Sequence, residues 1–142
     1  LLLENRWLPE LGTYDTIRSE VTYGQEKSRV DFVLDGTSQP IYVEVKSTTW
    51  SDGKRALFPD TVTTRGQKHI RELKGMLPEA RVCMLYFINR GDCTEFAPGD
   101  SADPTYGKLL RNAVEAGLEV YPCRFNVVPE GIQYLGLAEL KL

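Results

Sequence analysis

Three short stretches near the start of the chain are typical of strands: the first is rich in β-prone residues, and apolar and polar residues alternate in the second and third. In the second stretch, Val30, Phe32 and Leu34 are expected to share one face, because side chains two positions apart on a strand point the same way. Glycine-bearing segments separate the stretches, which indicates three short strands in an antiparallel meander. The three predicted strands are Thr16–Tyr23, Arg29–Asp35 and Ile41–Lys46.

Helical periodicity appears in two later segments. Thr64 and Gln67 have the spacing of a capping box, and an apolar stripe follows until Pro78, so a helix is predicted there. A second helix is expected to have Asp103 as its N-cap and to end at Gly117. Ser47–Thr64 and Gly91–Thr105 are expected to be irregular, and the remaining predicted strands are Val82–Ile88, Leu118–Val128 and Ile132–Leu140.

The predicted order of elements is β-β-β-α-β-α-β-β, which indicates one α/β domain over residues 1–142 with a mixed sheet. Leu1-Leu2-Leu3 reads as the end of a helix, so the predicted order becomes α-β-β-β-α-β-α-β-β, and an N-terminal partner domain is expected to be absent.

Composition narrows the classes of protein to consider. The 142 residues are 42% hydrophobic and 26% charged, as in an ordinary globular domain. No run of about 18 apolar residues exists, so no membrane association is predicted. The chain also lacks a signal-peptide pattern. The three cysteines lack the spacing of a zinc or redox motif, which favours a reducing, cytoplasmic location.

Charge is unevenly distributed along the chain. The net charge of −3 excludes a globally basic nucleic-acid binder. However, residues 44–75 carry seven cations and four anions, a local excess of +3. Such a segment either steers a polyanion to one place or is a solvated helix face.

Three charged residues form the main candidate site. Glu44 and Lys46 are expected to project together from the third strand, and pairing with the second strand can place Asp31 beside Glu44. Two adjacent carboxylates repel each other unless a cation or proton lies between them. Mg²⁺ binds one or two carboxylates and keeps several waters, leaving room for a phosphate oxygen. The Val45 backbone carbonyl is a further candidate ligand.

Together these residues indicate a site that can hydrolyse a phosphodiester. The metal ion would act as a Lewis acid and activate a water, and Lys46 would offset negative charge that develops on the phosphate. The alternative is an exposed, salt-bridged strand face, which contributes under about 1 kcal/mol to stability.

Longer stretches of the sequence resemble the sugar fermentation stimulation protein A family. The resemblance is carried by Ser28–Phe32, Tyr42–Thr49, Ala56–Leu73, Asp103–Tyr106, Ala116–Val120 and Val128–Ile132, and Leu57–Leu73 is its most specific block. It implies a restriction-endonuclease-like fold of the PD-(D/E)xK class, preceded in the family by an N-terminal OB-like domain. It also implies DNA binding, a metal-dependent nuclease core using Mg²⁺ or Mn²⁺, and a link to the regulation of maltose and sugar metabolism.

Carried over by position, the resemblance makes Asp31 and Glu44 the two acids of the motif and Lys46 its lysine. Val30 stands where the class name has proline. Many such nucleases add a glutamate from the first helix. Here Glu20 is either a substitute ligand or a solvent-facing strand residue.

A further set of residues is predicted to bind DNA: Arg65, Gln67, Lys68, His69, Arg71, Lys54 and Arg55. Most lie at or near a helix N-terminus, which suits phosphate. Gln67 is equally explained by the capping box, and His69 by helix packing against Leu73. Trp50 is the better candidate for base stacking than Trp7. A second set of residues, in an acidic loop, is expected to lie off the binding face: Asp92, Glu95 and Asp100.

Three functions follow from these observations: a Mg²⁺-dependent deoxyribonuclease, a DNA-binding regulator that keeps the nuclease fold without cleavage, or an interaction domain with solvated charges. The oligomeric state, with a homodimer as one option, is open.

Overall fold

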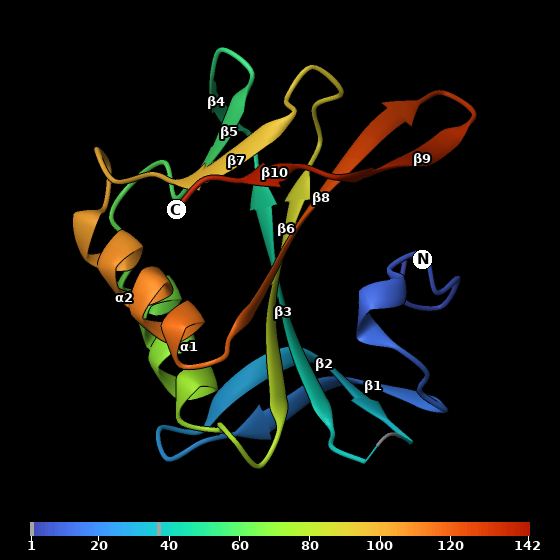
Figure 1. Ribbon diagram of the computed structural model, residues 1–142, viewed down its shortest axis with the longest axis vertical. Coiled ribbons are helices and arrows are strands. Elements are labelled where there is room, and N and C mark those ends of the chain that lie inside the picture. The colour runs from blue at the N-terminus through green and yellow to red at the C-terminus, as the bar shows by residue number, and fades with distance from the viewer. Residues whose placement is uncertain (1, 37) are drawn as a thin grey trace.

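The computed structural model describes residues 2–36 and 38–142, and its centre is a mixed six-stranded sheet (Figure 1). The strand order is β1-β2-β3-β6-β8-β9. The first three strands pair antiparallel, β3, β6 and β8 run parallel, and β9 returns antiparallel. The strand bounds are β1 Thr16–Tyr23, β2 Ser28–Asp35, β3 Ile41–Thr48, β6 Arg81–Ile88, β8 Glu119–Val128 and β9 Gly131–Leu137.

A smaller four-stranded sheet lies at one end of the molecule, in the order β10-β7-β5-β4 (Figure 1). Its strands are β4 Trp50–Asp52, β5 Arg55–Phe58, β7 Glu95–Pro98 and β10 Glu139–Leu140. The parallel pairing of β5 with β7 places Arg55 opposite Glu95.

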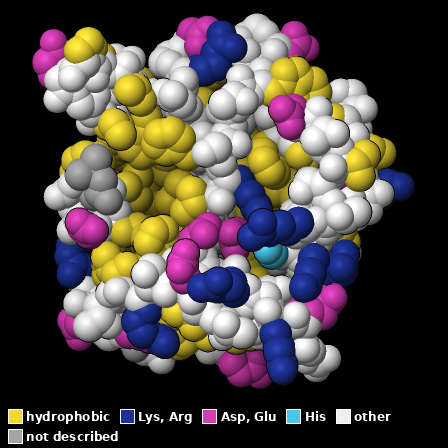
Figure 2. Space-filling model, turned by 180° about the vertical axis from the view of Figure 1, so that it is seen from behind, with side chains coloured by type: hydrophobic (Ala, Val, Ile, Leu, Met, Phe, Trp, Pro, Cys, Tyr) yellow, Lys and Arg dark blue, Asp and Glu magenta, His cyan; other side chains and the backbone are white. Residues whose placement is uncertain are grey.

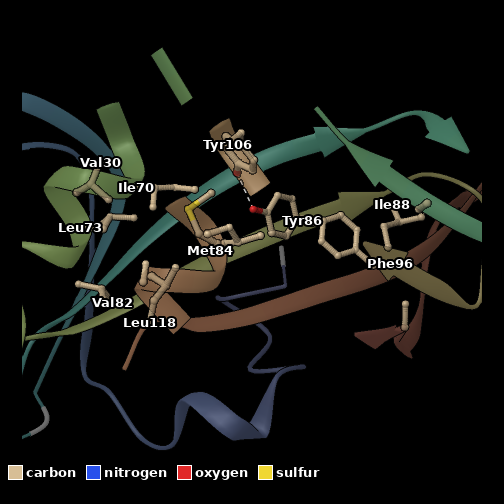
Figure 3. Close-up of a cluster of buried hydrophobic side chains, with 14 of the residues drawn as sticks. Val30, Ile70, Leu73, Val82, Met84, Tyr86, Ile88, Phe96, Tyr106 and Leu118 are labelled. Carbon is tan, nitrogen blue, oxygen red and sulfur yellow. Dashed lines mark hydrogen bonds between the residues drawn. The ribbon is translucent and has the colours of Figure 1, made fainter. Parts of the chain in front are cut away.

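Two helices cover one face of the large sheet: α1 spans Thr64–Lys74 and α2 spans Pro104–Glu115. Their apolar stripes pack on β6, where Met84 and Tyr86 are fully buried (Figure 3). The hydroxyl of Tyr86 is 2.6 Å from that of Tyr106, so two buried polar groups satisfy each other. The helices and the large sheet therefore share one hydrophobic core.

The other face of the sheet is covered by the N-terminal segment. Residues 2–6 form turns and are followed by a 3₁₀ helix, η1, at Pro9–Leu11. Leu3, Leu8 and Leu11 pack against apolar side chains of β2, β3, β6 and β8. The Arg81 guanidinium fastens this segment by donating to the backbone carbonyls of Glu10 and Leu11.

The mixed α/β fold and the antiparallel meander are confirmed. The expected N-terminal helix end is wrong for the described residues, which form turns. Two segments expected to be irregular contain β4, β5 and β7: β4 and β5 form a local hairpin, and β5 pairs with the distant β7. The first helix is capped by Thr63, which accepts from the Gly66 N–H, rather than by Thr64.

The expected common face of the second strand is also wrong. Phe32 and Leu34 pack with the N-terminal segment, whereas Val30 packs under α1 against Ile70 and Leu73 (Figure 3). The alternation changes at Asp31, where β2 stops pairing with β3. None of the helices in the described part of the chain is long and apolar enough to cross a membrane.

Candidate metal and nucleic-acid site

The site is built where β2 and β3 separate. Their pairing includes Phe32 with Val43 and stops there, so the next pair in register, Asp31 and Glu44, is outside the ladder. The Val45 N–H instead donates to Oδ2 of Asp31 at 2.7 Å. The sequence-predicted approach of Asp31 to Glu44 is thus present, in a local opening of the sheet.

The pairing of β1 with β2 is interrupted at the same place. Ser19 pairs with Phe32 and Val21 with Val30, but Glu20, which faces Asp31 in register, is unpaired. Its φ of 54° lies in the left-handed region, which is uncommon for a residue with a side chain. The Glu20 carboxylate is largely exposed and ion-pairs with Arg29 at 3.3 Å. Glu20 therefore lies on the rim of the opening, with its carboxylate directed to the Arg29 guanidinium.

Glu44 is the buried acid of the site. Its side chain is 4% exposed, and Oε2 has no hydrogen-bond partner among the described residues. Burial, together with the hydrogen bond to Asp31 and its negative charge, raises the pKa of Glu44 to about 8. Lys46 and Arg65 oppose this rise only in part, so in the metal-free protein this carboxyl group holds its proton near neutral pH.

Lys46 and His69 complete the buried cluster. Nζ of Lys46 is 2.9 Å from Nδ1 of His69 and 4.0 Å from Oε1 of Glu44. His69 Nδ1 is itself 3.8 Å from Oε1 of Glu44. Burial lowers the pKa of Lys46, and burial with the nearby charge of Lys46 lowers the pKa of His69 to about 4.

The two acids suit a hard divalent cation. An unpartnered buried carboxylate oxygen beside a second carboxylate is the chemistry that Mg²⁺ or Ca²⁺ neutralises. Within residues 2–36 and 38–142, no three His, Cys, Asp or Glu side chains are grouped to hold an ion. A cation here would need waters, a backbone carbonyl or a substrate oxygen to complete its shell.

The first turns of α1 place cations beside this cluster. The charge of Arg65 acts on Glu44, Lys46 and His69, and that of Lys68 acts on His69. Arg65, Lys68 and Arg71 are without an ion-pair partner in the part of the chain that the structure describes. They remain available for an anionic ligand.

Two residues of the predicted DNA-binding set are engaged inside the protein. The Gln67 amide donates to both carboxylate oxygens of Asp103, at 3.1 and 3.0 Å, so it does not close the expected capping box. His69 is 5% exposed and faces Lys46 rather than packing only against Leu73.

Asp103 connects the starts of the two helices. As expected, it caps α2 by accepting from the Tyr106 N–H. It also accepts from the Thr63 N–H at the start of α1. Sequence patterns had no signal for this second role, because Thr63 and Asp103 are 40 positions apart.

The other two predicted DNA-binding cations lie at the β4–β5 hairpin. Lys54 and Arg55 ion-pair with Glu95 at 3.6 and 3.3 Å. Glu95 was expected to lie away from these cations, but the parallel β5–β7 pairing brings it to them. The local positive excess therefore centres on α1.

An apolar hollow adjoins the acids (Figure 2). It has a volume of about 230 Å³, and Phe32 and Val45 line both this hollow and a neighbouring recess that contains Glu20 and Asp31. Figure 2 shows Asp and Glu side chains at the edge of the hollow, with Lys and Arg side chains beside them. Trp7 lies elsewhere, stacked on Tyr134, and Trp50 is half-buried in the small sheet.

Comparison with known proteins decides the family. The sequence profile described as the sugar fermentation stimulation protein RE domain matches residues 1–131. The chain belongs to this family.

Several members of the sugar fermentation stimulation protein family are close in sequence. The homologue from Acaryochloris marina is 66% identical over 140 residues, which are 99% of this chain and 58% of the relative. The homologue from Synechococcus elongatus is 68% identical over 141 residues, again 99% of this chain and 59% of the relative. This chain thus spans about three fifths of the length of these relatives.

A solved family structure has the same fold. The structure of Pyrococcus furiosus SfsA in complex with Ca²⁺ superposes with a TM-score of 0.91 at 30% sequence identity. The match covers 99% of this chain and 61% of that chain.

Proposed function

We propose that this domain binds DNA and hydrolyses its phosphodiester bonds with the help of Mg²⁺ or Mn²⁺. The observation that carries the proposal is the pair of the buried Glu44 and the half-buried Asp31, with an unpartnered Glu44 oxygen and a lysine beside it. Two adjacent carboxylates, one of them buried, repel each other, so a divalent cation between them is the natural partner. The family relative from Pyrococcus furiosus in complex with Ca²⁺, another hard cation, supports this interpretation.

Asp31 and Glu44 would hold the cation, with the Val45 carbonyl as a further ligand. The Val45 N–H points to Asp31, and the N–H and C=O of one strand residue point to the same side. When bound, the cation supplies Lewis-acid polarisation of a phosphate oxygen and activates water. Glu20, exposed and paired with Arg29, is a rim residue that could join the ligands only by leaving that pair.

The remaining residues bind and orient the DNA. The Lys46 ammonium lies within 4.0 Å of Glu44 and can stabilise negative charge that develops on the attacked phosphate. Arg65, Lys68 and Arg71 on α1 would contact the phosphate backbone, which positions the strand without reading its sequence. Lys54 and Arg55 would contribute less, because Glu95 already neutralises part of their charge.

The experiment is cleavage of labelled single- and double-stranded DNA by the purified protein, with Mg²⁺, Mn²⁺ or EDTA. Lys46→Ala is compared with Lys74→Ala, which removes the same charge from the far end of α1, where Lys74 donates to Asn112. Metal-dependent cleavage that is lost only in Lys46→Ala supports the nuclease. No cleavage of any DNA form, with equal DNA retardation by the parent and Lys46→Ala, would instead support a DNA-binding regulator.

A further inference from the structure

We propose that His69 is a positioning residue that holds the Lys46 ammonium in place through its Nδ1 atom. The inference rests on the proposed function, since it assigns His69 a part in the same site. Nδ1 is 2.9 Å from Nζ, the shortest contact that Lys46 makes within the cluster.

The direction of this hydrogen bond is assigned for the charged form of Lys46, the form that the proposed function requires. An ammonium group has three donors and no acceptor, so Nδ1 must accept from it. The imidazole is therefore neutral and carries its proton on Nε2. The nearby charges of Lys46, Arg65 and Lys68 favour this neutral state, because each repels an additional proton, whereas Asp31 opposes them.

His69 is well suited to position a lysine because its own position is fixed. It lies on α1, whose next residue, Ile70, is fully buried in the core beside Leu73. The helix start is held by the Thr63 cap and by the hydrogen bonds that the Thr63 N–H and the Gln67 amide donate to Asp103. Lys46 by contrast has a flexible four-carbon stem, and an anchored acceptor removes much of that freedom.

A neutral acceptor also preserves the charge of the lysine. If Lys46 were held only by Glu44, a close ion pair would cancel the positive charge that a phosphate needs. Instead Nζ lies 4.0 Å from Glu44 Oε1, beyond ordinary hydrogen-bonding distance, and 2.9 Å from an uncharged nitrogen. The two remaining ammonium protons stay available for an anion.

The first test does not depend on activity. In ¹⁵N-labelled parent protein at neutral pH, NMR should show Nδ1 unprotonated and Nε2 protonated. The Lys46 ammonium signal should be protected from solvent exchange in the parent, lost in His69→Phe, and retained in His69→Asn, whose amide oxygen can replace Nδ1. A protonated Nδ1, or an ammonium signal that His69→Phe leaves unchanged, would overturn the proposal.

The second test uses cleavage. His69→Phe should lower kcat by about 10- to 100-fold with little change in KM for DNA, because small misplacement of a reacting group has effects of this size. His69→Asn should recover most of the loss. In a Lys46→Ala background, His69→Phe should have no further effect on kcat, since the lysine that it positions is gone.

The outcomes separate this proposal from the nuclease assignment. Additive losses in the double variant, or full kcat in a folded His69→Phe protein, would overturn the positioning role while leaving the nuclease intact. A parent that cleaves no DNA would overturn the nuclease, and the tautomer and exchange measurements would then decide whether His69 holds Lys46. Urea unfolding of each variant separates loss of folding from loss of positioning.

Discussion

The Val45 N–H donates a 2.7 Å hydrogen bond to the Asp31 carboxylate at the point where β2 and β3 separate. In a continuous sheet, a backbone carbonyl of the neighbouring strand would accept a hydrogen bond from this N–H. Here the Asp31 carboxylate takes the place of that carbonyl, so the N–H keeps an acceptor where the strands are not paired. The same bond fixes Asp31 beside Glu44. The opening of the sheet and the acid pair are thus one structural feature.

Asp31→Asn should weaken Mn²⁺ binding by at least about ten-fold, because one of the two charged ligands becomes neutral while the amide oxygen can still accept from Val45. Isothermal titration calorimetry measures the affinity. Asp35→Asn, on the same strand but paired with Arg18, is the matched control. Equal Mn²⁺ affinity in the parent and Asp31→Asn would place the metal elsewhere.

Glu44 should make the metal-free protein less stable as pH rises from about 6.5 to 8. Its folded pKa of about 8 lies above its usual 4.5, so the folded state keeps a proton that the unfolded state has lost. The free energy of unfolding should then fall by up to about 1.4 kcal/mol per pH unit. His69 works in the opposite direction at the lower end of this window, because its pKa is about 4 in the folded state and 6.5 in the unfolded chain.

Glu44→Gln should flatten that pH dependence, as measured by urea unfolding at several pH values in EDTA. The surface variant Glu139→Gln serves as the control. A Glu44→Gln protein with the same decline as the parent would show that another group causes it.

Charge removal on α1 should change the salt dependence of DNA binding. Arg65→Gln with Lys68→Gln should reduce the slope of log affinity against log salt by about two, because each lost phosphate contact accounts for about one. Mobility shifts over a salt series provide the slope. The control is Lys54→Gln with Arg55→Gln, which should change the slope less, because Glu95 already ion-pairs with both of these cations. A larger change in slope for the Lys54→Gln, Arg55→Gln variant would show that DNA binds at the β4–β5 hairpin rather than at α1.

Lys46→Ala should slow cleavage by raising its activation free energy by roughly 3 kcal/mol, by analogy with the loss of an oxyanion donor. Metal affinity and most DNA affinity should remain, because Lys46 neither ligates the ion nor forms the α1 surface. Single-turnover kinetics and calorimetry measure the two effects separately. A parallel loss of Mn²⁺ affinity would mean that Lys46 acts by supporting the acids.

Asp103→Ala should destabilise the fold by about 2 kcal/mol, because it leaves the Thr63 and Tyr106 N–H groups and the Gln67 amide without their acceptor. Urea unfolding measures this loss. Asp92→Ala is the control, since Asp92 is an exposed loop residue that pairs with Arg90. A loss no larger than that of Asp92→Ala would show that the helix junction is held by packing alone.

Local sequence signals determined most of the elements of the large sheet and both helices. The β-prone stretches of β1 to β3, the proline and glycine limits of α2 and the apolar run of β6 depend on neighbouring residues, so the sequence alone reveals these elements. The strand period also places Glu44 and Lys46 on the face opposite Val43 and Val45, and the contacts of these residues agree with it.

The tertiary structure alone decided which charges meet. Glu95 reaches Lys54 and Arg55 through a parallel strand pair, and Asp103 reaches Thr63 across two helix starts. The contact of His69 with Lys46 joins a helix to a strand 23 positions away. No periodic pattern encodes such pairs, because they depend on how whole elements pack. The burial that raises the pKa of Glu44 likewise arises only when α1 closes over the sheet.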